Sequence, residues 1–300
     1  MTRGPNHTHG PNDTQGSSDG QGGQGGQGRH ADDLEVRLIL EAIYERYHYD
    51  FRDYAGSSLR RRLKAAQQRF GCTHLSQLQG RVLHEPEVFR SVLGDLTVQV
   101  SEMFRDPEYF RALREQVVPV LRTFPSLRIW VAGCSGGEEA YSMAILMKEE
   151  GLLDRTLIYA TDISQEALAQ AQAGVYRVDQ VPLYSANHRA SGGHGSLSEH
   201  YTAAYDHVLM DKALKERIVF SDHSLSTDSV FAEVQLVSCR NVLIYFNRAL
   251  QDRALGLFTE ALCRNGFLGL GARETLRFSA HAGEFVEIAA KERVYQKRSA

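Results

Sequence analysis

The chain has 300 residues, of which 42% are hydrophobic and 24% charged, and 34 Lys and Arg against 37 Asp and Glu give it a net charge of −3. These values are ordinary for globular proteins and exclude a chain-wide surface for nucleic acid or anionic membranes. The four cysteines never form a C-x-x-C pair and no apolar run approaches a membrane span, so we expect a cytoplasmic protein without a metal, a disulfide framework or a membrane-inserted segment. We also expect a monomer.

The first hundred residues divide into a polar tail and a helical unit. Residues 1–30 consist mostly of Gly, Gln, Ser, Asn and His, so they cannot bury enough surface to offset the entropy of ordering and are predicted to be disordered. From Asp32 an apolar stripe at helical spacing predicts a helix, Ser57 can cap a second one, and Pro86 begins another. We therefore predict an all-helical domain over residues 31–98.

The second of these helices is amphipathic and strongly basic. Residues 51–70 hold six Lys or Arg and one Asp, a local charge of +5 in a slightly acidic chain. Such a face favours an acidic partner, although a solvated surface is the commoner explanation of a basic helix.

Residues 99–126 are predicted to link this unit to a second domain, 127–300, with Asp106-Pro107 as the cap and first residue of a connecting helix. The second domain opens with a strand, a loop that contains Gly133, and a helix through Met147. Glycines at such a junction let backbone amides approach a nucleotide closely. The alternative is a tight turn without a ligand.

A second strand ends in Asp162, where a carboxylate can accept hydrogen bonds from both ribose hydroxyls of a nucleotide that lies over the glycine loop. An ordinary helix cap is the alternative for this residue. A nicotinamide dinucleotide also suits this pattern, but the loop is not G-x-G-x-x-G. Moreover, Glu138 and Glu139 place negative charge where a pyrophosphate would lie, which favours a ligand with an ammonium and a sulfonium group.

The remaining pattern completes an α/β domain. Residues 185–200 read as a polar surface loop, and two apolar runs within 201–221 predict an inserted β-hairpin. Strands are expected over 234–239 and 266–271, and an antiparallel pair near the C-terminus closes the sheet. We therefore predict a Rossmann-like, mostly parallel sheet with helices on both faces, preceded by the small all-α domain.

Five motifs together resemble the bacterial chemotaxis receptor glutamate methyltransferase family. They are Ser101-Glu-Met-Phe-Arg105, Ser135-Gly-Gly-Glu-Glu139-Ala-Tyr-Ser, Ala160-Thr-Asp162-Ile, Gly174-Val-Tyr176 and Cys239-Arg-Asn241-Val-Leu-Ile-Tyr245-Phe. The resemblance implies S-adenosylmethionine as cofactor and S-adenosylhomocysteine as product. It implies a cofactor site made of Gln99, Ser101, Arg105, Gly133, Glu139, Asp162, Ser224, Leu225, Arg240 and Asn241.

The same resemblance implies a partner and a reaction. The basic helix, with Arg60, Arg61, Arg62 and Arg69, would dock against the helical cytoplasmic domain of a chemoreceptor that is acidic at its methylation sites. Tyr245 would lie close to the transferring methyl group. The segment Gly271-Ala-Arg-Glu274 departs from the Gly-x-Ser-Glu form of the family, and we expect it to lie outside the main site.

The chemistry needs few catalytic groups. A glutamate side chain, with an unperturbed pKa of about 4.3, is already a carboxylate nucleophile near neutral pH, so no general base is required. Arg105 and Tyr245 are therefore hypothesised to orient the reactants, and their alternatives are a surface arginine and a core tyrosine. A receptor-binding module without turnover and a small-molecule methyltransferase or nicotinamide oxidoreductase stay open as other functions.

Overall fold

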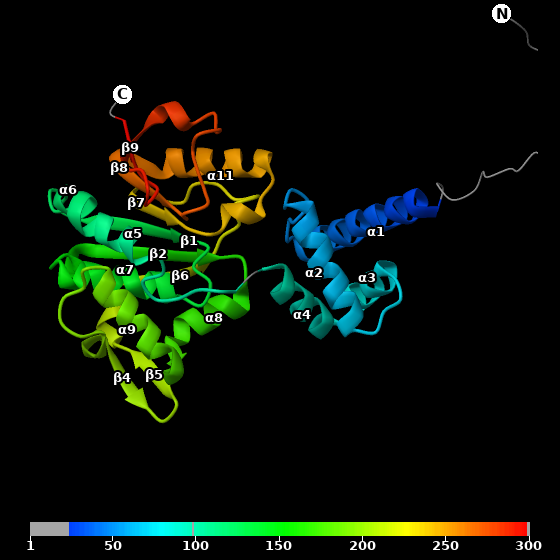
Figure 1. Cartoon of the computed structure of the whole chain (residues 1–300), viewed down its shortest axis with the longest axis horizontal. Helices are drawn as coiled ribbons and strands as arrows, with labels where there is room; N and C mark the ends of the chain where they lie inside the picture. The colour runs from blue at the N-terminus through cyan, green and yellow to red at the C-terminus, as the bar shows by residue number, and fades with distance from the viewer. Residues whose placement is uncertain (1–23, 98, 299–300) are drawn as a thin grey trace, which may run out of the picture.

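The computed structural model describes residues 24–97 and 99–298, which form a helical domain and an α/β domain joined by the segment around residue 99 (Figure 1). Within these two ranges, no helix is both long and apolar enough to cross a membrane. Of the tail predicted to be disordered, 1–30, residues 1–23 lie outside the described residues. Residues 24–30 belong to the first helix, so the prediction is wrong for them.

The N-terminal domain has four helices: α1 (Gln24–Tyr47), α2 (Gly56–Arg69), α3 (Leu75–His84) and α4 (Pro86–Leu96). Their apolar stripes meet in one core, in which Ile39, Leu63, Leu78 and Val92 are fully buried. The apolar pattern of the sequence predicts α1, α2 and α4, whereas the short α3 was not predicted. Ser57 does not cap α2, because the residue before the helix is Ala55 and no side chain bonds to its first turn.

The α/β domain contains a seven-stranded sheet. The strand order is β6 (Ile218–Asp222), β2 (Thr156–Asp162), β1 (Leu127–Ala132), β7 (Val234–Cys239), β8 (Leu262–Leu270), β10 (Val294–Lys297) and β9 (Phe285–Ala289). Only β10 runs antiparallel to its two neighbours, and every other neighbouring pair is parallel. The predicted fold class, with its antiparallel closing strand, is confirmed.

Each face of this sheet is covered by helices. The helices of the domain are α5 (Pro107–Ala112), η1 (Leu113–Val117), α6 (Val118–Leu121), α7 (Glu138–Glu149), α8 (Gln165–Ala173), α9 (Val181–Ala190), α10 (Lys212–Lys215) and α11 (Arg248–Ala261). Alternate side chains of β1 enter different cores: Ile129 and Val131 pack with α5 to α8, and Trp130 packs with α11 on the opposite face. A sheet buried on both faces explains why its strands are continuously apolar.

The inserted region differs from the prediction. The hairpin is formed by β4 (Tyr201–Ala204) and β5 (His207–Met210), which make a small separate sheet with β3 (Val175–Arg177). The second predicted hairpin strand is β6, which pairs in parallel with β2 at the edge of the main sheet, so the predicted pairing within 201–221 is wrong. Residues 185–200 are not a plain loop, because they include most of α9 and a short 3-10 turn, η4 (Leu197–His200).

Candidate functional site

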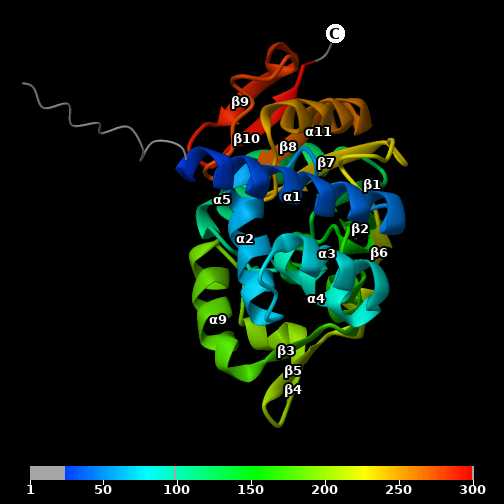
Figure 2. The ribbon, with the colours of Figure 1, turned by 90° about the vertical axis from the view of Figure 1, so that its right-hand side faces the viewer.

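The carboxyl ends of β1, β2 and β7 point toward the helical domain (Figure 1), and Figure 2 shows its four helices in front of this edge. A cavity of about 870 Å³, counted out to the solvent at its mouth, lies between the two domains. It is lined by Tyr54, Leu96, Thr97, Gln99, Val100, Ser101, Arg105, Gly133, Ser135, Glu139, Asp162, Ile163, His223, Leu225, Arg240, Asn241, Val242, Tyr245 and Phe246.

The glycine loop forms the floor of the cavity. Gly133 has a φ of 74°, and a Cβ atom there would clash with a methyl group of Val242, so both the backbone conformation and the space require glycine. The backbone N–H groups of Gly133 and Cys134 donate to the carbonyl of Thr161, which fastens the loop to β2. The loop therefore crosses directly beside the end of β2.

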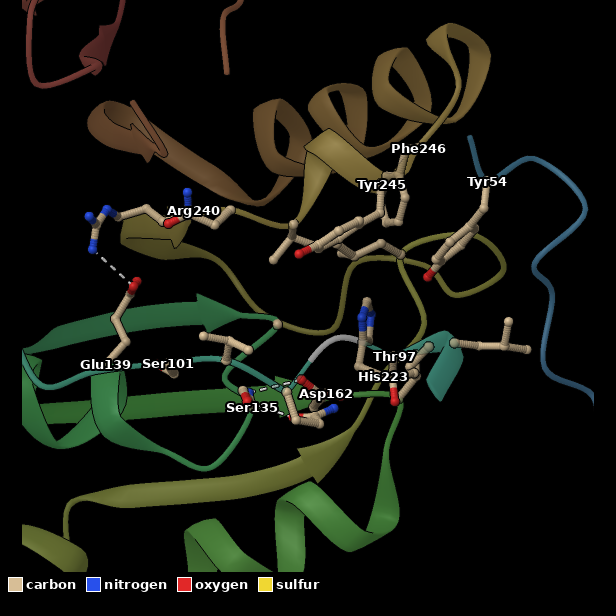
Figure 3. Close-up of a pocket in the computed structure, with 18 of the residues that line it drawn as sticks. Tyr54, Thr97, Ser101, Ser135, Glu139, Asp162, His223, Arg240, Tyr245 and Phe246 are labelled. Carbon is tan, nitrogen blue, oxygen red and sulfur yellow. Dashed lines mark hydrogen bonds and ion pairs between the residues drawn. The ribbon is translucent and has the colours of Figure 1, made fainter. Parts of the chain in front are cut away.

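Asp162 ends β2 on this floor, nearly buried (Figure 3). One carboxylate oxygen accepts the backbone N–H of Ser135 and the other that of Ser164, each at 2.9 Å. Burial, followed by the charge of Asp222, raises the pKa of Asp162 above its usual value. Because a carboxylate has about four acceptor positions, two remain for further donors such as a pair of hydroxyl groups.

Two further lining side chains hold buried acceptor atoms without a partner. Oδ1 of Asn241 makes no hydrogen bond to any described residue, and Asn241 has a φ of 61°. Nε2 of His223 lies 3.1 Å from the carbonyl of Ser229 and must donate to it, which leaves Nδ1 of the neutral ring as a buried acceptor, also without a described partner. Together with Asp162 these atoms fit a ligand rich in O–H and N–H donors, as an adenosine group is.

Glu139 and Arg240 form an ion pair at one end of the cavity (Figure 3), with 3.1 Å between Nη1 and Oε2. The guanidinium of Arg240, whose side chain is 1% exposed, also pairs with Asp106 at 2.7 Å and lies over the ring of Tyr109. Asp106 precedes α5 as its N-cap residue and Pro107 is the first residue of the helix, as predicted, but Asp106 has a φ of 54° and its side chain makes no capping bond. Its carboxylate pairs with Arg240 instead.

This ion pair changes the electrostatic argument made from the sequence. The sequence predicts free negative charge at Glu139, whereas Arg240 neutralises it. Glu138 is buried, and burial raises the pKa of its carboxyl. The two glutamates therefore repel a pyrophosphate less than the sequence suggests, and the choice of ligand rests on the lining acceptors rather than on net charge.

Tyr245 lies on the side of the cavity opposite Asp162, where the helical domain meets the sheet (Figure 3). Its carbonyl accepts the N–H of Ala55 at 2.7 Å, and the guanidinium of Arg62 lies 4.8 Å from the centre of its ring. Arg62 also donates to the carbonyl of Leu96 at 2.7 Å, and burial lowers its pKa. Tyr54 packs on Phe246, with ring centres 4.8 Å apart. The helical domain is thus part of the cavity wall.

The structure brings almost all predicted cofactor residues together. Gln99, Ser101, Arg105, Gly133, Glu139, Asp162, Leu225, Arg240, Asn241 and Tyr245 all line the cavity. Ser224 does not, because it lines a neighbouring hollow with Asp222 and Asp228. Among the residues that sequence reasoning missed, His223 directly follows β6, and assigning that strand to a hairpin hid the signal.

The predicted docking arginines have different surroundings. Arg60 pairs with Asp33 of α1, and Arg69 pairs with Asp95 of α4, so acidic residues of the same domain neutralise both arginines. Arg62 lies on Tyr245. Arg61 is exposed and has no ion-pair partner in the ranges that the structure covers.

One buried cluster outside the cavity has the residue types of a metal site. Nε2 of His188 lies 2.7 Å from Oε1 of Glu149, and Nε2 of His200 lies 3.4 Å from it. Arg114 already pairs with the other oxygen of Glu149. Nδ1 of His200 has no described acceptor, although a metal-bound imidazole normally donates its other N–H. We interpret the cluster as a hydrogen-bond network that fastens α9 and η4 to α7.

Comparison with known proteins gives matches over nearly the whole described chain. A sequence profile described as "CheR methyltransferase, SAM binding domain" matches residues 99–293, and one described as "CheR methyltransferase, all-alpha domain" matches residues 34–97. A Pseudomonas putida protein named Cher3, and described as a methyltransferase, is 55% identical over 265 residues, which cover 88% of this chain and 97% of that protein.

Two more distant relatives are called chemotaxis protein methyltransferase. The Listeria monocytogenes protein is 33% identical over 190 residues, which cover 63% of this chain and 70% of that protein. The Salmonella typhimurium protein is 29% identical over 268 residues, which cover 84% of this chain and 87% of that protein.

Proposed function

This chain belongs to the CheR methyltransferase family and is an S-adenosylmethionine-dependent enzyme, and from this premise we propose that it methylates glutamate side chains of chemoreceptors. The products are glutamate methyl esters and S-adenosylhomocysteine, and the role is signal adaptation in a chemotaxis-like pathway. The observation that carries the proposal is the cavity itself, which is walled on one side by nucleotide-type acceptors and on the other by the helical domain, whose helix α2 is basic.

Within this proposal, the sheet domain holds the cofactor. Asp162 accepts the ribose hydroxyls, while Asn241 and His223 offer their unpartnered acceptor atoms to N–H or O–H groups. Ser101 and Arg105 line the cavity on the connecting segment, and Arg105 can pair with the carboxylate of the amino-acid end. The bound cofactor supplies an electrophilic methyl group.

The acceptor glutamate enters beside Tyr245. Since its side chain is ionised near neutral pH, the protein has to align the carboxylate and exclude water rather than remove a proton. The hydroxyl of Tyr245 orients a reactant, and the nearby guanidinium of Arg62 attracts a carboxylate. Of the four proposed docking arginines, Arg61 and Arg62 are the two without an acidic partner in the described domain. These two therefore contribute most to the attraction of an acidic receptor surface.

The proposal predicts that labelled methyl moves from the cofactor to the glutamates of a chemoreceptor cytoplasmic fragment. We expect the label to be released by mild base, as a carboxyl ester requires. Because the receptor fragment is cytoplasmic, the enzyme is proposed to act in the cytoplasm. Asp162→Ala serves as the inactive control. Base-stable label, or label on a small molecule in place of receptor protein, would contradict the proposed function.

Replacing Tyr245 by Phe tests the proposed orientation role. We expect kcat to fall about 10- to 100-fold, the equivalent of one lost hydrogen bond to a charged group at about 1.5–3 kcal/mol. The affinity for S-adenosylhomocysteine, measured by calorimetry, should change little, because the ring and its packing remain. Tyr205→Phe is the matched control, since Tyr205 is fully exposed. Full activity of Tyr245→Phe would show that this tyrosine only packs.

A further inference from the structure

A buried carboxylate lies just behind the cavity. Glu274, in the loop after β8, is 4% exposed. Its Oε2 accepts the backbone N–H groups of Gly271 at 2.6 Å and Asn241 at 3.1 Å, and its Oε1 accepts that of Ile244 at 3.2 Å. All of these partners are donors of the main chain. None of the residues of Gly271–Glu274 lines the cavity, as expected from the sequence, but Glu274 bonds to the backbone of Asn241, which does.

The segment that Glu274 holds is residues 240–246, which we call the site loop. The loop carries Asn241, Val242, Tyr245 and Phe246 into the cavity wall. It leaves β7 through Asn241 in a left-handed conformation and then makes a single 3-10 turn, η5 (Leu243–Tyr245). Such an irregular segment has no strand or helix ladder to fix it, so its N–H groups need acceptors from elsewhere.

The space behind the loop is equally restricted. A Cβ atom on Gly271 would come 2.7 Å from the backbone nitrogen of Asn241 and 2.8 Å from Oε2 of Glu274. Gly271 therefore permits the close approach that lets one carboxylate reach both segments. Burial raises the pKa of Glu274, and the backbone N–H groups oppose that shift by stabilising the charged form.

We propose that Glu274 is a positioning residue of the cofactor site, whose carboxylate holds the site loop so that Asn241 and Tyr245 face the cavity. The bound cofactor then meets a preformed wall and does not have to order the loop when it binds. This inference deepens the proposed function and rests on it only for the role of Tyr245. The cofactor-binding part depends on the S-adenosylmethionine site alone.

Glu274→Gln is the discriminating variant. A carboxylate accepts at both oxygens, whereas an amide turns one of them into a donor. In either orientation the introduced NH₂ group would face a backbone N–H, either those of Gly271 and Asn241 or that of Ile244. Glu287→Gln is the matched control, because Glu287 is exposed on β9 and has no ion pair within the described ranges.

The readout is the Kd for S-adenosylhomocysteine, measured by calorimetry and by the emission of Trp130. This is the single tryptophan of the chain, and its ring centre lies 5.2 Å from that of His223 in the cavity wall. We expect Glu274→Gln to raise this Kd at least about 10-fold, as the loss of one hydrogen bond to a charged group would, and to lower kcat toward a receptor fragment. Glu287→Gln should leave both quantities close to those of the native protein.

A merely structural role gives a different pattern, in which Glu274→Gln lowers the melting temperature but leaves the Kd at its native value. That result would overturn the proposal. If Glu274→Gln does not fold, Gly271→Ala tests the same loop with the carboxylate retained, and an unchanged Kd in that variant would overturn it as well. A native protein that binds S-adenosylhomocysteine but methylates no receptor glutamate would refute the proposed function without touching this inference.

Discussion

Replacing Asp162 by Ala is expected to weaken the binding of S-adenosylmethionine and S-adenosylhomocysteine about 100-fold or more. The carboxylate is the only cavity-lining acid, among the described residues, that ends a strand of the sheet, and two acceptor positions remain on it. Two hydrogen bonds to a charged group contribute about 1.5–3 kcal/mol each, and about 1.4 kcal/mol corresponds to a tenfold change in Kd. Calorimetric titration with S-adenosylhomocysteine measures the change directly.

The control for this prediction is Asp154→Ala, which removes a fully exposed carboxylate just before the opposite end of β2. It should leave the Kd unchanged. A Kd close to native for Asp162→Ala would show that the residue acts only on the backbone of Ser135 and Ser164, as a cap of the following helix does.

Replacing Arg240 by Met is expected to lower the free energy of unfolding of the α/β domain by about 3–5 kcal/mol, because breaking a buried ion pair leaves an uncompensated charge. The charge left behind is chiefly that of Glu139, whose side chain is 13% exposed, whereas Asp106 can turn to solvent. Urea unfolding followed by Trp130 emission reports on this domain, since Trp130 is buried on β1.

The double variant Arg240→Met with Glu139→Gln separates charge from packing. If the buried glutamate charge causes the loss, the double variant should recover part of the stability that Arg240→Met alone removes. A loss below about 1 kcal/mol for Arg240→Met would mean that water reaches Glu139 well enough to replace its partner.

The sequence pattern was sufficient to predict those parts of the fold whose elements follow each other closely in the chain. The unit from β1 through the glycine loop to α7, and the acid at the end of β2, were predicted because strand, loop and helix follow each other within a few residues. The main errors of prediction concern strands that pair with a strand far away in the sequence. β6 pairs with β2, although the hairpin strands β4 and β5 lie between them in the chain, and an apolar run of this length carries no information on whether it joins a hairpin or a parallel sheet.

For the cavity, too, residues in local motifs could be predicted, whereas contacts between distant residues could not. Asp162, Asn241 and Tyr245 belong to motifs that can be read along the chain, and the structure places all three in the wall of one cavity. The neutralisation of Glu139 could not be read, because Arg240 lies 101 residues away. The contribution of Tyr54 was also hidden, since it belongs to a loop between two helices of the other domain and shows no motif.

The shared cavity wall limits how freely evolution can exchange the two domains. Tyr54 and Arg62 come from the unit proposed to choose the receptor, yet they pack on Phe246 and Tyr245 in the wall of the cavity. A gene fusion that supplied a new helical domain would therefore replace part of the catalytic pocket together with the receptor preference. Receptor choice and turnover are expected to change together in such chimaeras, and compensating substitutions should appear in the site loop.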